Sequence, residues 1–362
     1  MMTNSTKTHW AKVCQIMVGV SLAVVQGSLD VTAAGPAAPA DPARREYMKG
    51  VDLFQDGSIN EAVKAFKKAL ELNPKMAEAH YQLGLVHYQG KRQLSEAVNE
   101  LKQAIQINPN YVDANYELGL IYQVQGKFAD SEQVLRRAVE LSPKHEQALW
   151  ALARQYQRNR ENPKAIQTYM TLLDVKPDHT GALYSLGVIY DAAGESAKAR
   201  EVLQRLTKTD AAHPDGWYLL GRLEEKENNL PKAAQAYLMA ITAKPDLVDA
   251  HFNLGYIHKS QNKEQEALKE FREVLRLRPE YAEAHMSLGD LYTEQGRLFE
   301  AEDEYLTAVR LKPNLAEAHF NLGSFYELHK KDMVSAIAQY RKYLELGGKD
   351  ERAERIVGQA GR

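Results

Sequence analysis

The chain has 362 residues, of which 44% are hydrophobic and 26% charged, with only 22 Gly and 13 Pro. These proportions exclude a disordered chain, a collagen-like chain and a protein with many membrane spans. Its 46 basic and 48 acidic residues leave a net charge of -2. We therefore expect no nucleic-acid partner, because such binders need a strongly basic surface. The single cysteine, Cys14, excludes a disulfide framework and a cysteine-based metal site.

Residues 1–33 have the pattern of an export signal. Two lysines precede an uncharged stretch from Val13 to Leu29, and Val31-Thr32-Ala33 is a small-residue exit suited to cleavage. We predict a signal peptide removed after Ala33 and an exported, periplasmic protein. The alternative is an uncleaved membrane anchor facing the periplasm, because the 17 uncharged residues just reach the length of a spanning helix. A membrane contact is expected only in that case. Residues 34–42 form a stiff Pro/Ala linker that does not join a core.

A period of 34 residues governs the chain from Ala43 onward. A small residue recurs every 34 or 35 positions: Gly50, Gly84, Gly119, Ala153, Gly187, Gly221, Gly255, Gly289 and Gly323. A second small residue follows twelve or thirteen positions later in each unit, and a proline closes most units. The period predicts nine repeats over residues 43–348, which begin at 43, 77, 112, 146, 180, 214, 248, 282 and 316.

Each repeat is predicted to be a helical hairpin. In residues 248–281, apolar residues recur at spacings of three and four on both sides of Gln261-Asn262-Lys263, which is helical spacing. Pro279 ends the second helix. Gly255 and Ala267 remove side-chain bulk where the two helix axes come closest. A single hairpin cannot bury both of its faces, so neighbouring hairpins must stack.

Two local departures and the tail complete the pattern. Two repeats contain one extra residue, which we place in the hairpin turns at 89–95 and 329–335. Residues 349–362 carry Ile356 and Val357 on an otherwise charged stretch. We expect them to form a short helix that caps the last hairpin, followed by a tail.

These repeats resemble the tetratricopeptide repeat (TPR) family. The resemblance is nearly complete in Glu317-Ala318-His319-Phe320-Asn321-Leu322-Gly323, followed by Tyr326 and Ala336, and it covers residues 43 to about 348. It implies an all-α fold, a right-handed α-solenoid of nine TPR hairpins with a C-terminal capping helix. It also implies a non-catalytic scaffold that binds a protein partner in a concave groove.

No group of residues in the sequence indicates catalysis or cofactor binding. His80, His251, His285 and His319 take the same place in their repeats, but adjacent copies lie a whole hairpin apart. We therefore interpret them as packing residues between helices. Neither a Ser/His/Asp arrangement nor a Gly-rich phosphate loop stands out. We expect no enzymatic activity, no catalytic residue, no cofactor and no metal site.

The resemblance implies that the fifth position of each repeat points into the groove. These residues are Tyr47, Tyr81, Tyr116, Trp150, Tyr184, Tyr218, Phe252, Met286 and Phe320. Such an aromatic ladder could anchor a bound segment or pack between repeats, and the sequence leaves both roles open. The second positions include Glu78, Asp113, Asp215, Asp249, Glu283 and Glu317. These acids could attract a basic partner or only stabilise the helix N-termini through the helix dipole.

The candidate partner-binding residues are Tyr116, Trp150, Arg154, Arg158, Tyr184 and Arg222. Trp150, Arg154 and Arg158 share one helix face by their i, i+4, i+8 spacing. Such a cluster suits an acidic or C-terminal segment, unless the arginines merely solvate the helix. We therefore favour a scaffold of the cell envelope that binds a partner protein. The alternative is a glycan-binding accessory subunit of a sugar-handling or polysaccharide-export complex, in which the aromatic rings stack on a sugar.

Overall fold

The structure, a computed structural model, describes residues 41–360, and every regular element in that range is a helix. The chain divides into two compact units, the first ending at Lys176 and the second beginning at Pro177. The predicted signal peptide, its cleavage site and residues 34–40 of the predicted linker lie outside the described residues. Among the helices that the structure describes, none has the length and apolar character needed to cross a membrane.

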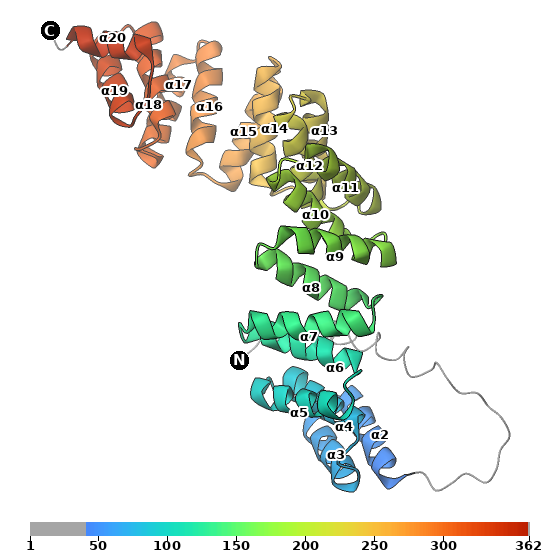
Figure 1. The fold of residues 1–362 in the computed structure, drawn as a ribbon. Helices are drawn as coiled ribbons and strands as arrows, with labels where there is room; N and C mark the ends of the chain where they lie inside the picture. The colour runs from blue at the N-terminus through green and yellow to red at the C-terminus, as the bar shows by residue number, and fades with distance from the viewer. Residues whose placement is uncertain (1–40, 361–362) are drawn as a thin grey trace. The chain divides into compact units, whose positions relative to one another are not determined.

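The first unit consists of four helical hairpins that follow one another in chain order (Figure 1). They are α2 (Pro42–Gln55) with α3 (Ile59–Leu72), α4 (Ala77–Leu85) and its extension η2 (Val86–Gly90) with α5 (Leu94–Ile107), α6 (Val112–Val124) with α7 (Phe128–Leu141), and α8 (Glu146–Arg158) with α9 (Asn162–Val175).

The second unit consists of five hairpins and a final helix, α20 (Glu351–Ala360). The hairpins are α10 (Thr180–Ala192) with α11 (Ser196–Thr209), α12 (Pro214–Lys226) with α13 (Leu230–Ala243), α14 (Val248–Ser260) with α15 (Glu264–Leu277), α16 (Ala282–Glu294) with α17 (Leu298–Leu311), and α18 (Ala316–Phe325) and its extension η3 (Tyr326–Lys330) with α19 (Met333–Glu345). The predicted fold class, an all-α stack of nine helical hairpins with a C-terminal capping helix, is confirmed.

A contact between a small and a large residue holds the two helices of each hairpin together. A Cβ atom added to Gly289 would lie 2.7 Å from the ring of Tyr305, and one added to Gly187 would lie 2.6 Å from Leu203. The glycine on the first helix therefore makes room for a large buried side chain on the second helix. Gly255, which was predicted to lie at this crossing together with Ala267, faces Phe271, whose ring would be the first contact of an added Cβ atom.

The extra residue of two hairpins is not in the turn, as we predicted, but in the first helix. Helix α4 widens into the π-helical turn η2, in which the Lys91 amide donates to the Val86 carbonyl five residues earlier, at 3.1 Å. Helix α18 continues in the same way into η3. A π-helical turn takes up one additional residue and keeps the backbone hydrogen-bonded, so the pairing of the two helices is preserved.

The two ends of the described chain are both capped. Helix α2 begins at Pro42, the last residue of the predicted linker, because Asp41 accepts a hydrogen bond from the Ala43 amide at 3.1 Å and proline suits the first helical turn. At the other end, Ala353 of α20 is fully buried against Ala336 and Tyr340 of α19, with Ile356 and Val357 beside it.

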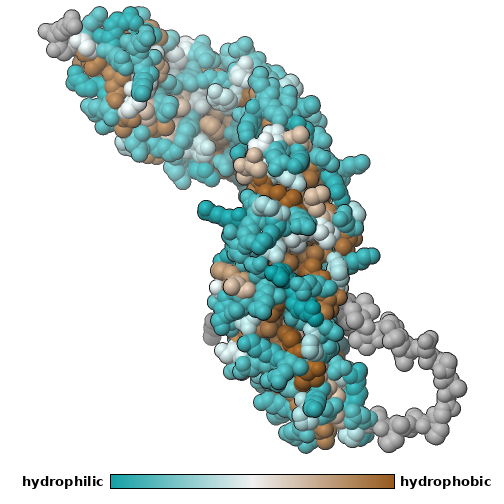
Figure 2. All heavy atoms as spheres, in the orientation of Figure 1, coloured by the Kyte–Doolittle hydropathy of each residue, from teal (hydrophilic) through white to brown (hydrophobic). Residues whose placement is uncertain are grey.

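The surface is mostly polar. Figure 2 shows hydrophilic residues over most of the visible face, with hydrophobic residues concentrated along the seams between helices. This distribution is expected for amphipathic helices that bury one face against their neighbours.

Substitution of Gly289 by Val should destabilise the second unit by about 1–3 kcal/mol, because the added side chain overlaps the fully packed ring of Tyr305. The measurement is the thermal unfolding midpoint by circular dichroism. Gly358→Val is the control, since a Cβ at Gly358 in α20 meets no atom within 4 Å. Equal midpoints for the two variants would contradict this role of Gly289.

Candidate partner-binding site

In four hairpins a histidine on the first helix contacts both the second helix and the turn that precedes the hairpin. In His251, Nδ1 lies 2.6 Å from the Glu270 carboxylate on the second helix, and Nε2 lies 3.0 Å from the Pro245 carbonyl. His80 and His285 make the same two contacts, with Glu100 and Pro74 and with Glu304 and Pro279. In His319 the side chain on the second helix is Gln339. The predicted packing role of these histidines is therefore confirmed.

The contacts of three of these histidines require a charged ring. A carboxylate and a carbonyl are both hydrogen-bond acceptors, so each ring nitrogen must carry a proton to donate to them. For His251 and His285, burial lowers the pKa of the ring, but the hydrogen bonds to the carboxylate and the carbonyl outweigh it and the pKa is raised. For His80 the hydrogen bond to Glu100 is the largest cause of a raised pKa.

Three other histidines serve as N-caps, in which a ring nitrogen accepts a hydrogen bond instead of donating one. His145, His179 and His213 each accept a backbone N–H through Nδ1 at 3.0–3.1 Å, at the starts of α8, α10 and α12. An accepting Nδ1 carries no proton, so protonation of that nitrogen would break the cap. Within the described residues no three His, Cys, Asp or Glu side chains converge on a point that could hold a metal ion.

The contribution of His80, His251 and His285 to the free energy of unfolding should decrease as the pH rises from 6 to 8.5, because the three rings lose their charge. Their folded pKa lies above the unfolded value of 6.5, so their contribution is complete below pH 6.5 and is lost through the folded pKa. The triple variant Glu100→Gln, Glu270→Gln, Glu304→Gln should show a smaller fall, since each ring then faces a glutamine, as His319 faces Gln339. Urea unfolding of both proteins across this pH range gives the measurement, and identical pH profiles would show that the rings are neutral.

The aromatic ladder packs within and between hairpins. Each aromatic fifth-position side chain of the described chain has another aromatic ring at 4.9–6.0 Å between centroids. Tyr116 lies 5.3 Å from His145 of the next hairpin, and Trp150 lies 5.7 Å from Tyr169 of its own. Both remain half-buried, so one side of each ring packs and the other is left accessible.

Four of the six predicted site residues lie on neighbouring helices of the first unit. Tyr116 is on α6, and Trp150, Arg154 and Arg158 are on α8; we call these four residues the candidate face. Tyr184 and Arg222 belong to α10 and α12 of the second unit. The structure therefore places the tryptophan, the two arginines and one tyrosine on two first helices of one unit, and it describes the other two residues only within the second unit.

The two arginines of the candidate face are exposed and lie against aromatic rings. The Arg154 guanidinium carbon is 5.6 Å from the centroid of the Trp150 ring, and that of Arg158 is 4.0 Å from the Phe128 ring. Among residues 41–360, no carboxylate oxygen lies within 4.0 Å of either guanidinium group. Arg222 differs, because Asp191 lies 4.0 Å away and offsets its charge. Arg154 and Arg158 are therefore the predicted basic residues whose charge is left for a partner.

Side-chain amides fix α8 against α6 behind the candidate face. Gln155 is buried and accepts from Gln123 of α6 at 3.2 Å, while its own amide donates to Asn159 at 3.1 Å. Gln123 also approaches the Ala151 carbonyl at 3.4 Å. This network holds the helix that carries the arginines in place before any ligand binds, which lowers the entropy cost of binding.

Sequence reasoning missed Glu117, which follows Tyr116 on α6. Burial raises the pKa of its carboxyl group to about 7, and the nearby Asp113 adds to the shift, whereas His145 opposes it. Burial is also the main cause that raises the pKa of Tyr81, Tyr88 and Tyr116, and the charge of Glu117 adds to each shift. The acidic residue directly after Tyr116 was the only signal in the sequence. Glu117 makes the candidate face chemically mixed and not uniformly basic.

Family profiles match most of the described chain. The profile described as a TPR repeat matches residues 50–90, 91–126, 255–296 and 289–329. Two profiles described as tetratricopeptide repeats match residues 151–214 and 190–248, and residues 112–145. The chain belongs to the tetratricopeptide repeat family. No curated protein sequence matches it.

Solved TPR structures resemble parts of the chain. YrrB, a TPR protein with an unusual peptide-binding site, is 20% identical, with 52% of this chain and 96% of YrrB covered at a TM-score of 0.47. MamA is 21% identical, with 46% and 91% covered at 0.43. PilF of Pseudomonas aeruginosa is 18% identical, with 56% and 92% covered at 0.47. At these identities the similarity concerns the fold alone.

Membership of the TPR family sets the broad function. TPR repeats form protein–protein interaction scaffolds, which are typically non-catalytic. The chain is accordingly an interaction scaffold. Its partner must be sought on its surface, because stacked hairpins use their apolar faces to hold each other.

Proposed function

We propose that this TPR protein is a non-catalytic scaffold of the cell envelope and that its candidate face binds an acidic or C-terminal segment of a partner protein. The observation that carries the proposal is the exposed Arg154 beside Trp150, followed one turn later by the exposed Arg158, both of which the described chain leaves without a carboxylate. Arginine pairs with carboxylates through two parallel hydrogen bonds, and a neighbouring aromatic ring adds apolar contact area.

The geometry of the face supports a protein segment as the ligand. Arg154 and Arg158 are one helical turn apart, so their guanidinium groups can contact acidic groups at successive points of one segment. The half-buried rings of Tyr116 and Trp150 provide rigid anchors that lose little entropy on binding. The buried amides of Gln123 and Gln155 keep the two helices in register beneath this surface.

Export supports the cell-envelope part of the proposal. The apolar stretch from Val13 to Leu29 and the small-residue exit at Val31-Thr32-Ala33 have the order and lengths of a signal peptide. A mature chain that begins at Ala34 would lack Cys14 and contain no cysteine, which suits an oxidising compartment.

Native protein isolated from its source cells should begin at Ala34 and be recovered in the periplasmic fraction. Signal peptidases cleave after small residues, and Ala33 is the last residue of such a site. Edman sequencing of the native N-terminus tests this prediction. An intact N-terminus in the membrane pellet would favour the anchored form instead.

Trp150→Ala and Arg154→Glu should each weaken binding of the partner by about 2 kcal/mol, which is roughly thirtyfold in affinity. The partner is first identified by affinity purification of the mature chain from its own cell envelope, followed by mass spectrometry. Isothermal titration calorimetry with the purified partner then gives the affinities. Circular dichroism establishes that the variants are folded.

Arg276→Glu is the matched control for charge reversal. Arg276 is exposed on α15 and pairs with Glu273 on the same helix, so it should not contribute to binding. Equal affinities for Arg154→Glu and Arg276→Glu would mean that Arg154 only solvates its helix. A glycan as the purified ligand, bound equally well at high salt, would replace the protein partner with the sugar-handling alternative.

A further inference from the structure

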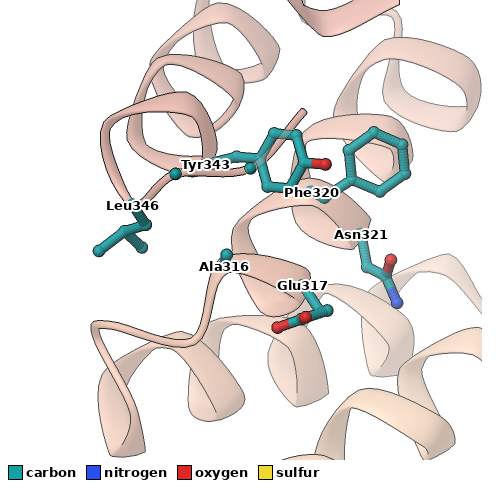
Figure 3. A pocket seen from close by; sticks show the side chains of 8 residues that line it. Ala316, Glu317, Phe320, Asn321, Tyr343 and Leu346 are labelled. Atoms are coloured by element: carbon teal, nitrogen blue, oxygen red, sulfur yellow. The ribbon is translucent and has the colours of Figure 1, made fainter. Parts of the chain in front are cut away.

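A second candidate binding site lies at the end of the second unit, between the last hairpin and the loop that leads to α20. It is a pocket of about 340 Å³ beside α18 and the end of α19 (Figure 3). Its walls are formed by Ala316, Glu317, Phe320, Asn321, Tyr343, Leu346, Gly347 and Gly348. The volume is at the lower end of the range for small-ligand pockets and is large enough for one long side chain.

The preceding hairpin shows which group belongs beside Glu317. There the equivalent residue, Glu283, forms an ion pair with Lys312, the residue directly after the second helix, α17. In the last hairpin Glu317 takes the place of Glu283, and because η3 adds one residue to the first helix, Gly347 takes the place of Lys312. The last hairpin thus retains the carboxylate and has lost its lysine, and the pocket is lined by both Glu317 and Gly347.

The lysine that corresponds to Lys312 is paired in another hairpin as well. Lys176, directly after α9, pairs at 2.9 Å with Glu146, which lies one residue before the position equivalent to Glu283. Glu317 is exposed and has no cation within 4.0 Å among the residues that the structure describes. Its charge is stabilised only weakly, by the helix dipole at the first turn of α18.

The aromatic wall of the pocket is held in position by its neighbours. The Tyr343 ring lies 5.0 Å from the Phe320 ring. It also packs so closely on the loop backbone that a Cβ atom at Gly348 would lie 2.2 Å from it. Gly347 has a φ of +88°, a conformation that favours glycine, and it lets the chain turn over the ring. The site is therefore formed before any ligand arrives.

A hydrogen-bond network orients the polar wall. The Asn321 amide nitrogen donates to Asp290 of α16 at 3.2 Å, and Asp290 also binds Tyr305 at 2.7 Å and Lys259. With its N–H group engaged, Asn321 has its carbonyl oxygen left as an acceptor. Glu317 and Asn321 are four residues apart, so both acceptors lie on one face of α18, below the two aromatic rings in Figure 3.

We propose that this pocket binds the side chain of a lysine or arginine from a partner protein. The cationic group lies against Glu317 and Asn321, in the place that Lys312 occupies in the preceding hairpin, and the aliphatic stem lies against Phe320, Tyr343 and Leu346. Acceptor oxygens beside aromatic faces are the surroundings that such cations favour. The site lies in the second unit and takes the opposite charge from the candidate face, so it does not rest on the proposed function.

The probes are Nα-acetyl-lysine amide and Nα-acetyl-arginine amide, with Nα-acetyl-norleucine amide as the uncharged control. They are titrated into the full chain labelled with ¹⁵N-glycine, and the amide shifts of Gly347 and Gly348 report on the pocket. We expect saturable shifts with both cationic probes and none with the norleucine probe. Comparable shifts with all three probes, or no shift with any, would overturn the proposal.

Two variants test whether Glu317 is the acceptor and whether the bound cation takes the place of the lysine that this hairpin lacks. Glu317→Gln should weaken both cationic probes by about fivefold, as expected for one exposed ion pair. Leu346→Lys places an ammonium group in the pocket wall, next to the position of the missing lysine, and should block both probes by pairing with Glu317, with the circular dichroism spectrum unchanged. Glu354→Gln removes an exposed charge from α20 outside the pocket and should leave the affinities as they are. Binding that is unchanged by Glu317→Gln and Leu346→Lys would disprove a cation site here.

Discussion

The close approach of the two helices in each hairpin depends on a glycine that leaves space for a large side chain on the second helix. In six hairpins the two residues are sixteen positions apart, as with Gly119 and Leu135, and in the second and ninth hairpins they are seventeen apart. The π-helical turns explain the difference, because the additional residue widens the first helix and leaves the contact in place. The fourth hairpin uses Ala153 against Tyr169, so an alanine is also tolerated at this position.

A second recurring contact joins five of the described hairpins to the turn before them. A side chain at the fourth position donates to the carbonyl six residues earlier, which is Pro245 for His251. In the sixth hairpin the turn carries Ala211 in place of proline and the donor is the Trp217 indole, at 2.9 Å. The carbonyl is satisfied in both cases, which shows that the requirement is a donor of the right reach and not a histidine as such.

The charges on the surface follow a related principle. Most repeats supply their own counter-ions across one hairpin or between neighbours, as Glu283 with Lys312 does. Where the partner residue is missing, the remaining charge is available to another molecule. Arg154 and Glu317 are of this kind, with opposite signs and in different units. Because an exposed ion pair contributes little to stability, one of its two residues can be substituted without disturbing the fold.

The sequence by itself determined the number of hairpins, the helix periodicity, the capping helix and the family. The repeat pattern occurs nine times and depends on residues that are close together in the chain, so each copy supports the assignment of the others. It also placed the aromatic ladder and the residues of the candidate face. It did not reveal that the extra residue enters the helix at Val86, that Glu117 is partly buried, or that Gly347 in place of a lysine leaves Glu317 without a cation. Only the tertiary structure decided these points, because each depends on side chains or backbone atoms brought together by packing, often from helices a full hairpin apart.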